Sequence, residues 1–240
     1  MYMCGRYVLA EDPAVLVSEF GAEFATEAFN HVAGRSNFNI APTTMVPVVR
    51  VEHGADSVDH RVLDLIRWGI APKWAGGKST ILVNARGESV AEKSTFKKAF
   101  ATSRCLIPAT GYYEWKRPEK DPYFISRAGK TPMAMAGLIV GSELDGEVQP
   151  TCAIITLPAA ANIQSIHDRM PASIDQEDWQ EWLDPDVGSD EALMLMKADP
   201  NLIAHNVSRR VNSIRHNDAS LIKPLAPDAE HEAPQQDRLL

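Results

Sequence analysis

The sequence has few cysteines and no long apolar run, and each shortage excludes a class of protein. Its three cysteines, Cys4, Cys105 and Cys152, are odd in number and widely spaced, which favours reduced thiols in a cytosol over a disulfide framework. No stretch approaches the roughly 18 apolar residues of a membrane span. The N-terminus also lacks the basic and apolar regions of a secretion signal. We therefore expect a cytoplasmic chain with no membrane partner.

Common metal-binding patterns are missing as well. The sequence contains no Cys-x-x-Cys pair and no His-Glu-x-x-His, which are spacings by which many proteins hold zinc. We expect neither a metal site nor a cofactor.

An excess of positive charge is also absent, since 24 Lys and Arg stand against 32 Asp and Glu, a net charge of −8. A general affinity for nucleic acid is therefore not expected. The charge is nevertheless uneven: residues 61–130 hold 14 basic and 6 acidic side chains, and residues 175–240 hold 6 basic and 14 acidic. The basic segment fits either a local anion-binding face or an ordinary mixed surface, because charges beyond about 8 Å are largely screened at physiological salt.

The patterns that are present mostly indicate strands. The expected strands are 5–9, an apolar strand after a turn at 37–43, 60–70, two within 105–117, 123–126, 132–140, 150–157 and 202–212; the expected helices are 13–20, 90–103, 175–183 and 190–198. Strands that outnumber helices and do not alternate with them favour an α+β fold. We predict one domain over residues 4–225, with a mostly antiparallel, barrel-like sheet and flanking helices. The proline-rich, polar residues 226–240 predict a disordered tail.

Four short clusters combine reactive side chains with residues that fix backbone shape or supply flat apolar surface. They are CGRY (4–7), VNARGES (83–89), CLIPATGYYEW (105–115) and IHDRMP (166–171). Glu114 has an aromatic neighbour on each side, where loss of water disfavours a charged carboxylate and suits the group to acid and base catalysis; a surface glutamate on a strand is the alternative. His167 could transfer protons or hydrogen-bond at the edge of the core. Asn84 could hold an intermediate or cap a turn.

The arginines and tryptophans of these regions also allow two interpretations. Arg6 and Arg86 suit phosphate groups, and surface arginines look the same in a sequence. Trp68, Trp74 and Trp115 could stack on unpaired bases, but large aromatic side chains also fill cores.

Taken together, C-G-R-[YF], N-A-R-x-E, R-C-[LI]-[IV]-P-A-x-G-[YF]-[YF]-E-W and H-x-R-M-P, in this order, resemble the motifs of the SOS response-associated peptidase family, the SRAP domains. The resemblance runs from Cys4 to about Leu225. It includes NFNIAPT (37–43), RWGIAPKW (67–74) and VNSIRHND (211–218).

The resemblance implies a protein that acts on single-stranded DNA containing abasic sites, as a monomer that associates with the nucleoid. Members of the family form a reversible covalent crosslink through a cysteine at the mature N-terminus, and this position falls on Cys4. An abasic sugar opens to an aldehyde, a primary amine condenses with it to a Schiff base, and a neighbouring thiolate closes a thiazolidine ring. An N-terminal cysteine carries both the amine and the thiolate.

The family also implies roles for the other motif residues. Glu114 would transfer protons, His167 would assist Schiff-base formation, and Asn84 would orient the sugar. The implied DNA contacts are Arg6, Asn39, Pro42, Thr43, Trp68, Gly69, Trp74, Arg86, Trp115, Arg169 and Met170.

Residues 1–3 conflict with this chemistry, because a preceding residue turns the nitrogen of Cys4 into a peptide amide. Tyr2 is too bulky to permit removal of Met1 alone. Initiation at Met3, self-cleavage before Cys4 and an inactive N-terminus each fit the sequence. We expect residues 1–3 to be absent from the mature protein.

Two other classes of function remain open. A cysteine peptidase that uses Cys4, His167 and Glu114 needs only a thiolate and a base, so it would tolerate a blocked α-amine. A non-catalytic single-strand binding module would use the tryptophans and arginines alone. It would retain DNA after Cys4→Ala, with no bond that survives denaturation.

Overall fold

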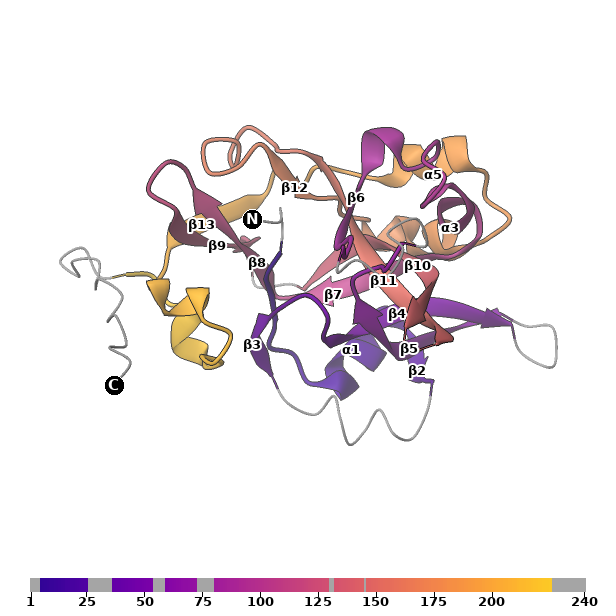
Figure 1. Cartoon of the computed structure of the whole chain (residues 1–240), viewed down its shortest axis with the longest axis horizontal. Coiled ribbons are helices and arrows are strands. Elements are labelled where there is room, and N and C mark those ends of the chain that lie inside the picture. The colour runs from indigo at the N-terminus through magenta and orange to yellow at the C-terminus, as the bar shows by residue number, and fades with distance from the viewer. Residues whose placement is uncertain are drawn as a thin grey trace.

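The computed structural model describes residues 5–25, 36–53, 59–72, 80–129, 132–144 and 146–225, and a closed five-stranded barrel lies at its centre (Figure 1). In pairing order its strands are β5 (Asp59–Trp68), β4 (Met45–His53), β7 (Arg104–Ala109), β10 (Met133–Leu144) and β11 (Glu147–Pro158). These neighbours pair antiparallel, and a parallel pairing of β11 with β5 closes the ring. Closure protects the barrel strands from pairing with other chains.

A second sheet of five strands lies against the barrel. Its order is β13 (Leu202–Asn206), β9 (Asp121–Arg127), β8 (Gly111–Lys116), β1 (Tyr7–Leu9) and β3 (Asn37–Ile40), all antiparallel. Thr110 alone separates β7 from β8, so the chain passes directly from the barrel into this sheet. Gly111 permits the close approach of β9, because a Cβ there would lie 2.5 Å from the carbonyl oxygen of Ile125.

The other elements are short strands, helices and 3-10 turns outside the barrel ring and the second sheet. The additional strands are β2 (Ala22–Phe24), parallel to β5; β6 (Asn84–Arg86), parallel to β11; and β12 (Arg169–Pro171), antiparallel to β11. The helices are α1 (Pro13–Phe20), α3 (Lys97–Thr102), α4 (Trp179–Leu183) and α5 (Ser189–Leu195), and the 3-10 turns are η2 (Gly87–Ser89), η3 (Gln176–Asp178), η4 (Arg209–Asn212) and η5 (Ala219–Ile222). No helix among the described residues is long and apolar enough to cross a membrane.

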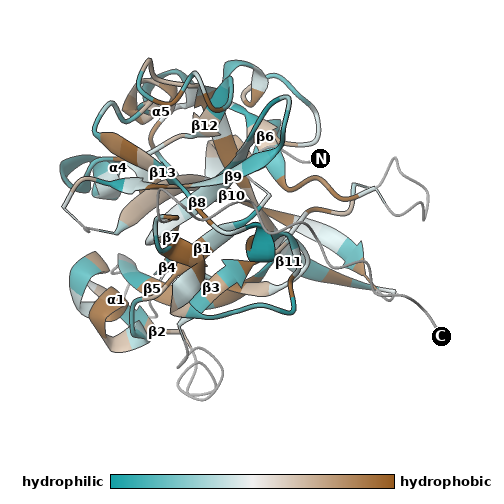
Figure 2. Ribbon diagram, turned by 90° about the vertical axis from the view of Figure 1, so that its left-hand side faces the viewer, coloured by the Kyte–Doolittle hydropathy of each residue, from teal (hydrophilic) through white to brown (hydrophobic). Residues whose placement is uncertain are grey.

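The apolar residues form two clusters. The larger one fills the barrel and the contacts of α1, α4 and α5 with it, and all six residues of β7 are buried. A strand covered on both faces is apolar along its length rather than alternating. The smaller cluster, with Val8, Tyr113 and Val211 at 0% exposure, lies between the second sheet and the C-terminal 3-10 turns. Figure 2 shows apolar residues along the central strands and polar ones mainly on the outer turns.

The predicted α+β, single-domain, barrel-like architecture is confirmed. The first helix is also as predicted: Asp12 caps it through a 2.8 Å bond from the Ala14 N–H, Pro13 begins it, and Gly21 ends it with a φ of 56°.

Three local predictions need correction. Of the helix predicted over 90–103 only α3 forms, because turns and a 3-10 segment precede it. The late strand ends at Asn206, since Ser208 caps η4. Residues 37–40, predicted as part of a turn, form β3. Residues 1–4 and the tail 226–240 lie outside the described residues.

Candidate functional site

The start of β1 lies beside the strand that carries Glu114. Tyr7 pairs with Tyr112, and one step further on the Tyr113 N–H donates to the Arg6 carbonyl at 2.9 Å. Glu114 follows at 2% exposure. Gly5, the residue after Cys4 in the sequence, is half-buried. Two motifs that are more than 100 residues apart thus meet between β1 and β8. Cys4 and Trp74 lie outside the described residues.

Arg6 is held in place by the C-terminal segment. Its Nη1 donates to Asn39 Oδ1 at 2.6 Å and to the Val211 carbonyl at 2.9 Å. Burial lowers the pKa of Arg6 from its usual value, while the field of Tyr113 raises it; arginine nevertheless stays charged at neutral pH. A fixed cation therefore lies two residues after Cys4.

Asn39 is a structural tether. Its side chain is 5% exposed, and its Nδ2 donates to the carbonyls of Ser213 and His216 at 3.0 and 2.8 Å. Because the buried Asn39 amide already hydrogen-bonds these carbonyls, it does not fit the DNA contact predicted for this side chain.

Two other motifs meet across the end of β11. On one side β6 places Asn84 opposite Ile154 and Arg86 opposite Thr156; on the other, β12 places Arg169 opposite Pro158. Asn84 is half-buried and Arg86 is exposed. The structure thus brings VNARGES and IHDRMP to the same strand end.

Arg169 joins these two motifs instead of facing solvent. It binds both carboxylate oxygens of Glu88, the second at 2.8 Å, and donates to the Thr156 carbonyl at 2.6 Å. Two parallel charge-assisted bonds fix both side chains, and the bond from Arg169 is the main cause that lowers the pKa of Glu88. The DNA contact predicted for Arg169 does not fit this arrangement. Met170 is also fully buried, and its sulfur accepts the Ala160 N–H at 3.2 Å.

The ring of His167 is oriented by its own backbone turn. Its Nδ1 lies 3.0 Å from the Arg169 N–H and 3.1 Å from Asp168 Oδ1. Nδ1 can accept from Arg169 only when it carries no proton, and it can pair with the 85% exposed Asp168 only when it does. A neutral His167 bonded to Arg169 therefore carries its proton on Nε2, where it can be donated to a ligand.

Trp68 and Trp115 are buried, so neither ring offers an open face for a base. Trp68 is 0% exposed, its Nε1 donates to the Val83 carbonyl at 2.9 Å, and its ring packs edge-on against Tyr7 at 5.3 Å. Trp115 is 7% exposed and donates to Asn212 Oδ1 at 2.7 Å. The stacking predicted for these two residues is corrected: Trp68 supports both β1 and the residue before Asn84.

The turn between β3 and β4 adds an exposed edge beside Trp68. Thr43 donates its N–H to the Trp68 carbonyl at 2.7 Å and has a φ of 74°, which is unusual for a β-branched residue. Pro42 is half-buried and Thr43 exposed. Gly69 has a φ of 121°, and a Cβ there would lie 2.5 Å from Ile81 Cγ2.

The two cysteines that the structure describes, Cys105 and Cys152, are unsuited to nucleophilic catalysis. Cys105 and Cys152 are both 0% exposed, and burial raises the pKa of each thiol well above its usual value. A neutral, enclosed thiol is a poor nucleophile.

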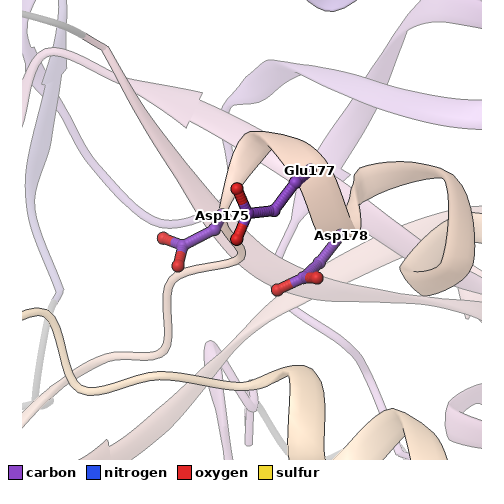
Figure 3. Close-up of side chains that lie close together, drawn as sticks. All are labelled: Asp175, Glu177 and Asp178. Carbon is purple, nitrogen blue, oxygen red and sulfur yellow. The ribbon is translucent and has the colours of Figure 1, made fainter.

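Asp175, Glu177 and Asp178 form the one described group of carboxylates compact enough to suggest a metal site (Figure 3). Lys197 Nζ lies 2.7 Å from Asp175 and 3.0 Å from Asp178. This ammonium already binds two of the three carboxylates, so the cluster carries no argument for a metal.

The sequence did not single out Glu88, although it lies inside a recognised motif. The only available signal was the motif N-A-R-x-E itself, whose acidic residue had no predicted role. Its partner, Arg169, lies 81 positions away.

Comparisons with known proteins agree with this arrangement. Residues 3–214 match the family model described as SOS response associated peptidase (SRAP). The chain is 32% identical over 231 residues to the abasic site processing protein YoqW of Bacillus subtilis, which covers 92% of this chain and 99% of the relative. It is 28% identical over 229 residues to the abasic site processing protein YedK of Escherichia coli, at 93% and 100% coverage.

The fold has a counterpart among solved structures. A crystal structure of a protein from Bacteroides thetaiotaomicron superposes with a TM-score of 0.79 at 23% identity, covering 93% of this chain and all of the other. The matches over nearly the whole length show that this chain belongs to the SOS response associated peptidase family.

Proposed function

We propose that this chain processes abasic sites in single-stranded DNA and forms a reversible covalent crosslink to them through Cys4. The observation that carries the proposal is the match, over 92% of the chain, to a relative named an abasic site processing protein. The chain acts as a monomer in the cytoplasm, on nucleoid DNA. Its reactive form begins at Cys4.

The crosslink forms in two steps whose atoms balance. The α-amine of Cys4 adds to the sugar aldehyde and releases water, which gives a Schiff base. The Cys4 thiolate then attacks the imine carbon, and the nitrogen takes up a proton as the thiazolidine ring closes. Because the amine has a reference pKa of about 7.7 to 8.0, a substantial fraction is unprotonated near neutral pH.

Glu114 is the proton carrier in this proposal. The bond between the Tyr113 N–H and the Arg6 carbonyl holds its strand beside the start of β1, and its 2% exposure keeps bulk water away. A carboxyl group in this position can protonate the sugar ring oxygen as the ring opens, and can take the proton back when the crosslink reverses.

His167 and Asn84 orient the sugar from the other side of the site. The two motifs flank one end of β11. A neutral His167 donates from Nε2 to the hydroxyl that leaves as water, and the Asn84 amide hydrogen-bonds the sugar. The exposed Arg86 binds a phosphate, and Arg6 supplies a fixed positive charge next to Cys4.

A denaturing gel tests the proposal directly. Protein that begins at Cys4 is mixed with single-stranded DNA that contains one abasic site, and we expect a slow-migrating band. The band should disappear with Cys4→Ala and after acetylation of the α-amine. A peptidase that needs only the thiolate would not depend on that amine. No band with any form of the protein would refute crosslinking.

The fate of residues 1–3 is tested by intact mass. Protein made from its native gene should lack Met1, Tyr2 and Met3, through initiation at Met3 or through self-cleavage. Retention of all three would rule out covalent crosslinking by the natural protein.

A further inference from the structure

A loop near the C-terminus is held in shape by side chains from the site motifs. The loop comprises residues 211–217. The buried amide of Asn39 donates to its carbonyls at Ser213 and His216, and Arg6 donates to its carbonyl at Val211. These bonds turn the carbonyl groups inward, toward the motif residues.

Both ends of the 211–217 loop have further anchors. Trp115 Nε1 donates to Asn212 Oδ1 at 2.7 Å, and the Phe38 N–H donates to Asn217 Oδ1 at 2.7 Å. Val211 itself is 0% exposed in the smaller apolar cluster. The loop is therefore preformed and needs little ordering when it binds a ligand.

Two neighbouring side chains at the tip of this loop remain exposed. Ile214 is 65% exposed. Arg215 is exposed, and within the described part of the chain its guanidinium has neither an ion pair nor a hydrogen bond. An apolar and a cationic side chain are thus held outward on a rigid support.

The surrounding segment is a basic island in an acidic region. Residues 205–225 contain four basic side chains and one acidic one, whereas residues 175–240 as a whole contain 14 acidic and 6 basic. Two of the four are neutralised locally: Arg209 by Asp121 at 2.7 Å and Arg210 by Asp218 at 2.9 Å. Arg215 has no such carboxylate partner among the described residues, so its positive charge is available to bind an anion. Figure 1 shows this C-terminal segment beside β3.

We propose that the 211–217 loop is part of the DNA interface, with Arg215 on a backbone phosphate and Ile214 against the adjacent base or sugar. The proposal rests on the proposed function, and it assigns the flanking strand rather than the abasic sugar to this loop. Single-stranded DNA offers anionic phosphates alternating with apolar base faces, which complements an arginine next to an isoleucine. The tether through Arg6 and Asn39 connects the loop to the residues that follow Cys4.

Fluorescence anisotropy with a labelled single strand that lacks an abasic site isolates this interface from the crosslinking chemistry. We expect Arg215→Gln to reduce the steepness of log affinity against log salt concentration by about 0.7, the value for one lost phosphate contact on a single strand. Ile214→Ser should weaken binding by about three- to tenfold and leave the slope unchanged.

Two matched variants serve as controls. Lys197→Gln removes the same positive charge, but from an ammonium already neutralised by Asp175 and Asp178. Met194→Ser removes an apolar side chain that is 78% exposed on α5. Neither should change affinity or slope, and unfolding temperatures should show that all four variants are folded.

The outcomes separate the two proposals. If wild-type protein binds and crosslinks DNA while the Arg215 and Ile214 variants match it in affinity and slope, the loop assignment is wrong. If the controls lose as much affinity as the loop variants, net charge or general apolar contact explains the effect and the loop assignment again fails. If wild-type protein neither binds nor crosslinks single-stranded DNA, the proposed function fails and the loop assignment fails with it.

Discussion

At the scale of single residues, the motifs identify the side chains that matter but not the direction in which they face. Trp68 and Arg169 were both predicted to touch DNA. The structure buries the first under β1 and binds the second to Glu88. A sequence cannot distinguish a side chain that contacts a ligand from one that holds such a side chain in place, because the distinction depends on partners far away in the chain.

Trp68→Phe tests this change of role. Loss of the bond to the Val83 carbonyl and of part of a packed ring should lower the free energy of unfolding by about 1 to 3 kcal/mol. Crosslinking should slow because β1 and Asn84 lose support, whereas affinity for intact single-stranded DNA should stay the same. Anisotropy measures DNA affinity, and the gel assay measures crosslinking.

Trp182→Phe is the matched control, because it removes a similarly buried indole bonded to the Cys105 carbonyl. It should destabilise the protein comparably without slowing crosslinking. Lost DNA affinity in Trp68→Phe alone would restore the stacking role.

The ion pair of Glu88 with Arg169 predicts a pH dependence of stability. The folded-state pKa of Glu88 is lowered from 4.5, so its contribution is complete above the unfolded pKa and is lost as the pH falls through the folded value. Since Glu88 is 48% exposed, solvent screening limits this contribution to about 1 kcal/mol. Urea unfolding should therefore show Glu88→Gln to be less stable than wild type at pH near 6, with the difference vanishing once the pH lies below the lowered folded-state pKa of Glu88. A difference that stays constant with pH would show that the pair does not stabilise the fold.

At the scale of elements, individual strands could be predicted but most of their pairings could not. Periodicity and turn residues located β5, β8 and β9 within a few positions. The short parallel strand β6 could not be predicted, because its three residues acquire a partner only when β11 passes beside them, 70 positions later. Because β6 and β12 meet across β11, Asn84 and His167 lie in one region. Pairing between segments so far apart in the chain cannot be read from the local sequence pattern of either.

Gly111 allows β8 and β9 to approach each other more closely than a residue with a side chain would permit. Gly111→Ala would place a Cβ 2.5 Å from the Ile125 carbonyl and within 3 Å of the Phe124 ring, so β8 must separate from β9. We expect a loss of at least about 2 kcal/mol of unfolding free energy, together with reduced crosslinking, because β8 carries Glu114. Thermal unfolding measures the first effect. Gly188→Ala, where a Cβ meets nothing within 4 Å, should cost less than about 1 kcal/mol, the penalty for alanine at the N-cap of α5. Equal effects of the two changes would contradict the close approach of β9.

At the scale of the whole molecule, the order of expected strands and helices predicted the fold class, but it did not predict the closure of the barrel. The parallel pairing of β11 with β5 joins strands about 85 residues apart in an otherwise antiparallel ring, and no pattern in either strand specifies it. The charge pattern alone favoured an ordinary mixed surface for residues 61–130 over a DNA-facing one. The structure shows which arginines already pair with a carboxylate: Arg50, Arg127, Arg169, Arg209 and Arg210. Of these five, Arg127 alone lies in the basic segment 61–130.

A protein with a net charge of −8 should bind single-stranded DNA through a small number of phosphates. Suppose that Arg86, Arg215 and one neighbouring group together make two or three phosphate contacts. A plot of log affinity against log salt concentration should then have a slope of about −1.5 to −2, since each contact contributes about −0.7. Affinity should then drop by roughly 8- to 16-fold between 50 and 200 mM salt, as measured by anisotropy with an intact strand. A slope steeper than about −4 would mean that the basic segment 61–130 acts as one broad cationic face. A slope near zero would mean that the phosphates are not bound at all, and that recognition depends on the abasic sugar alone.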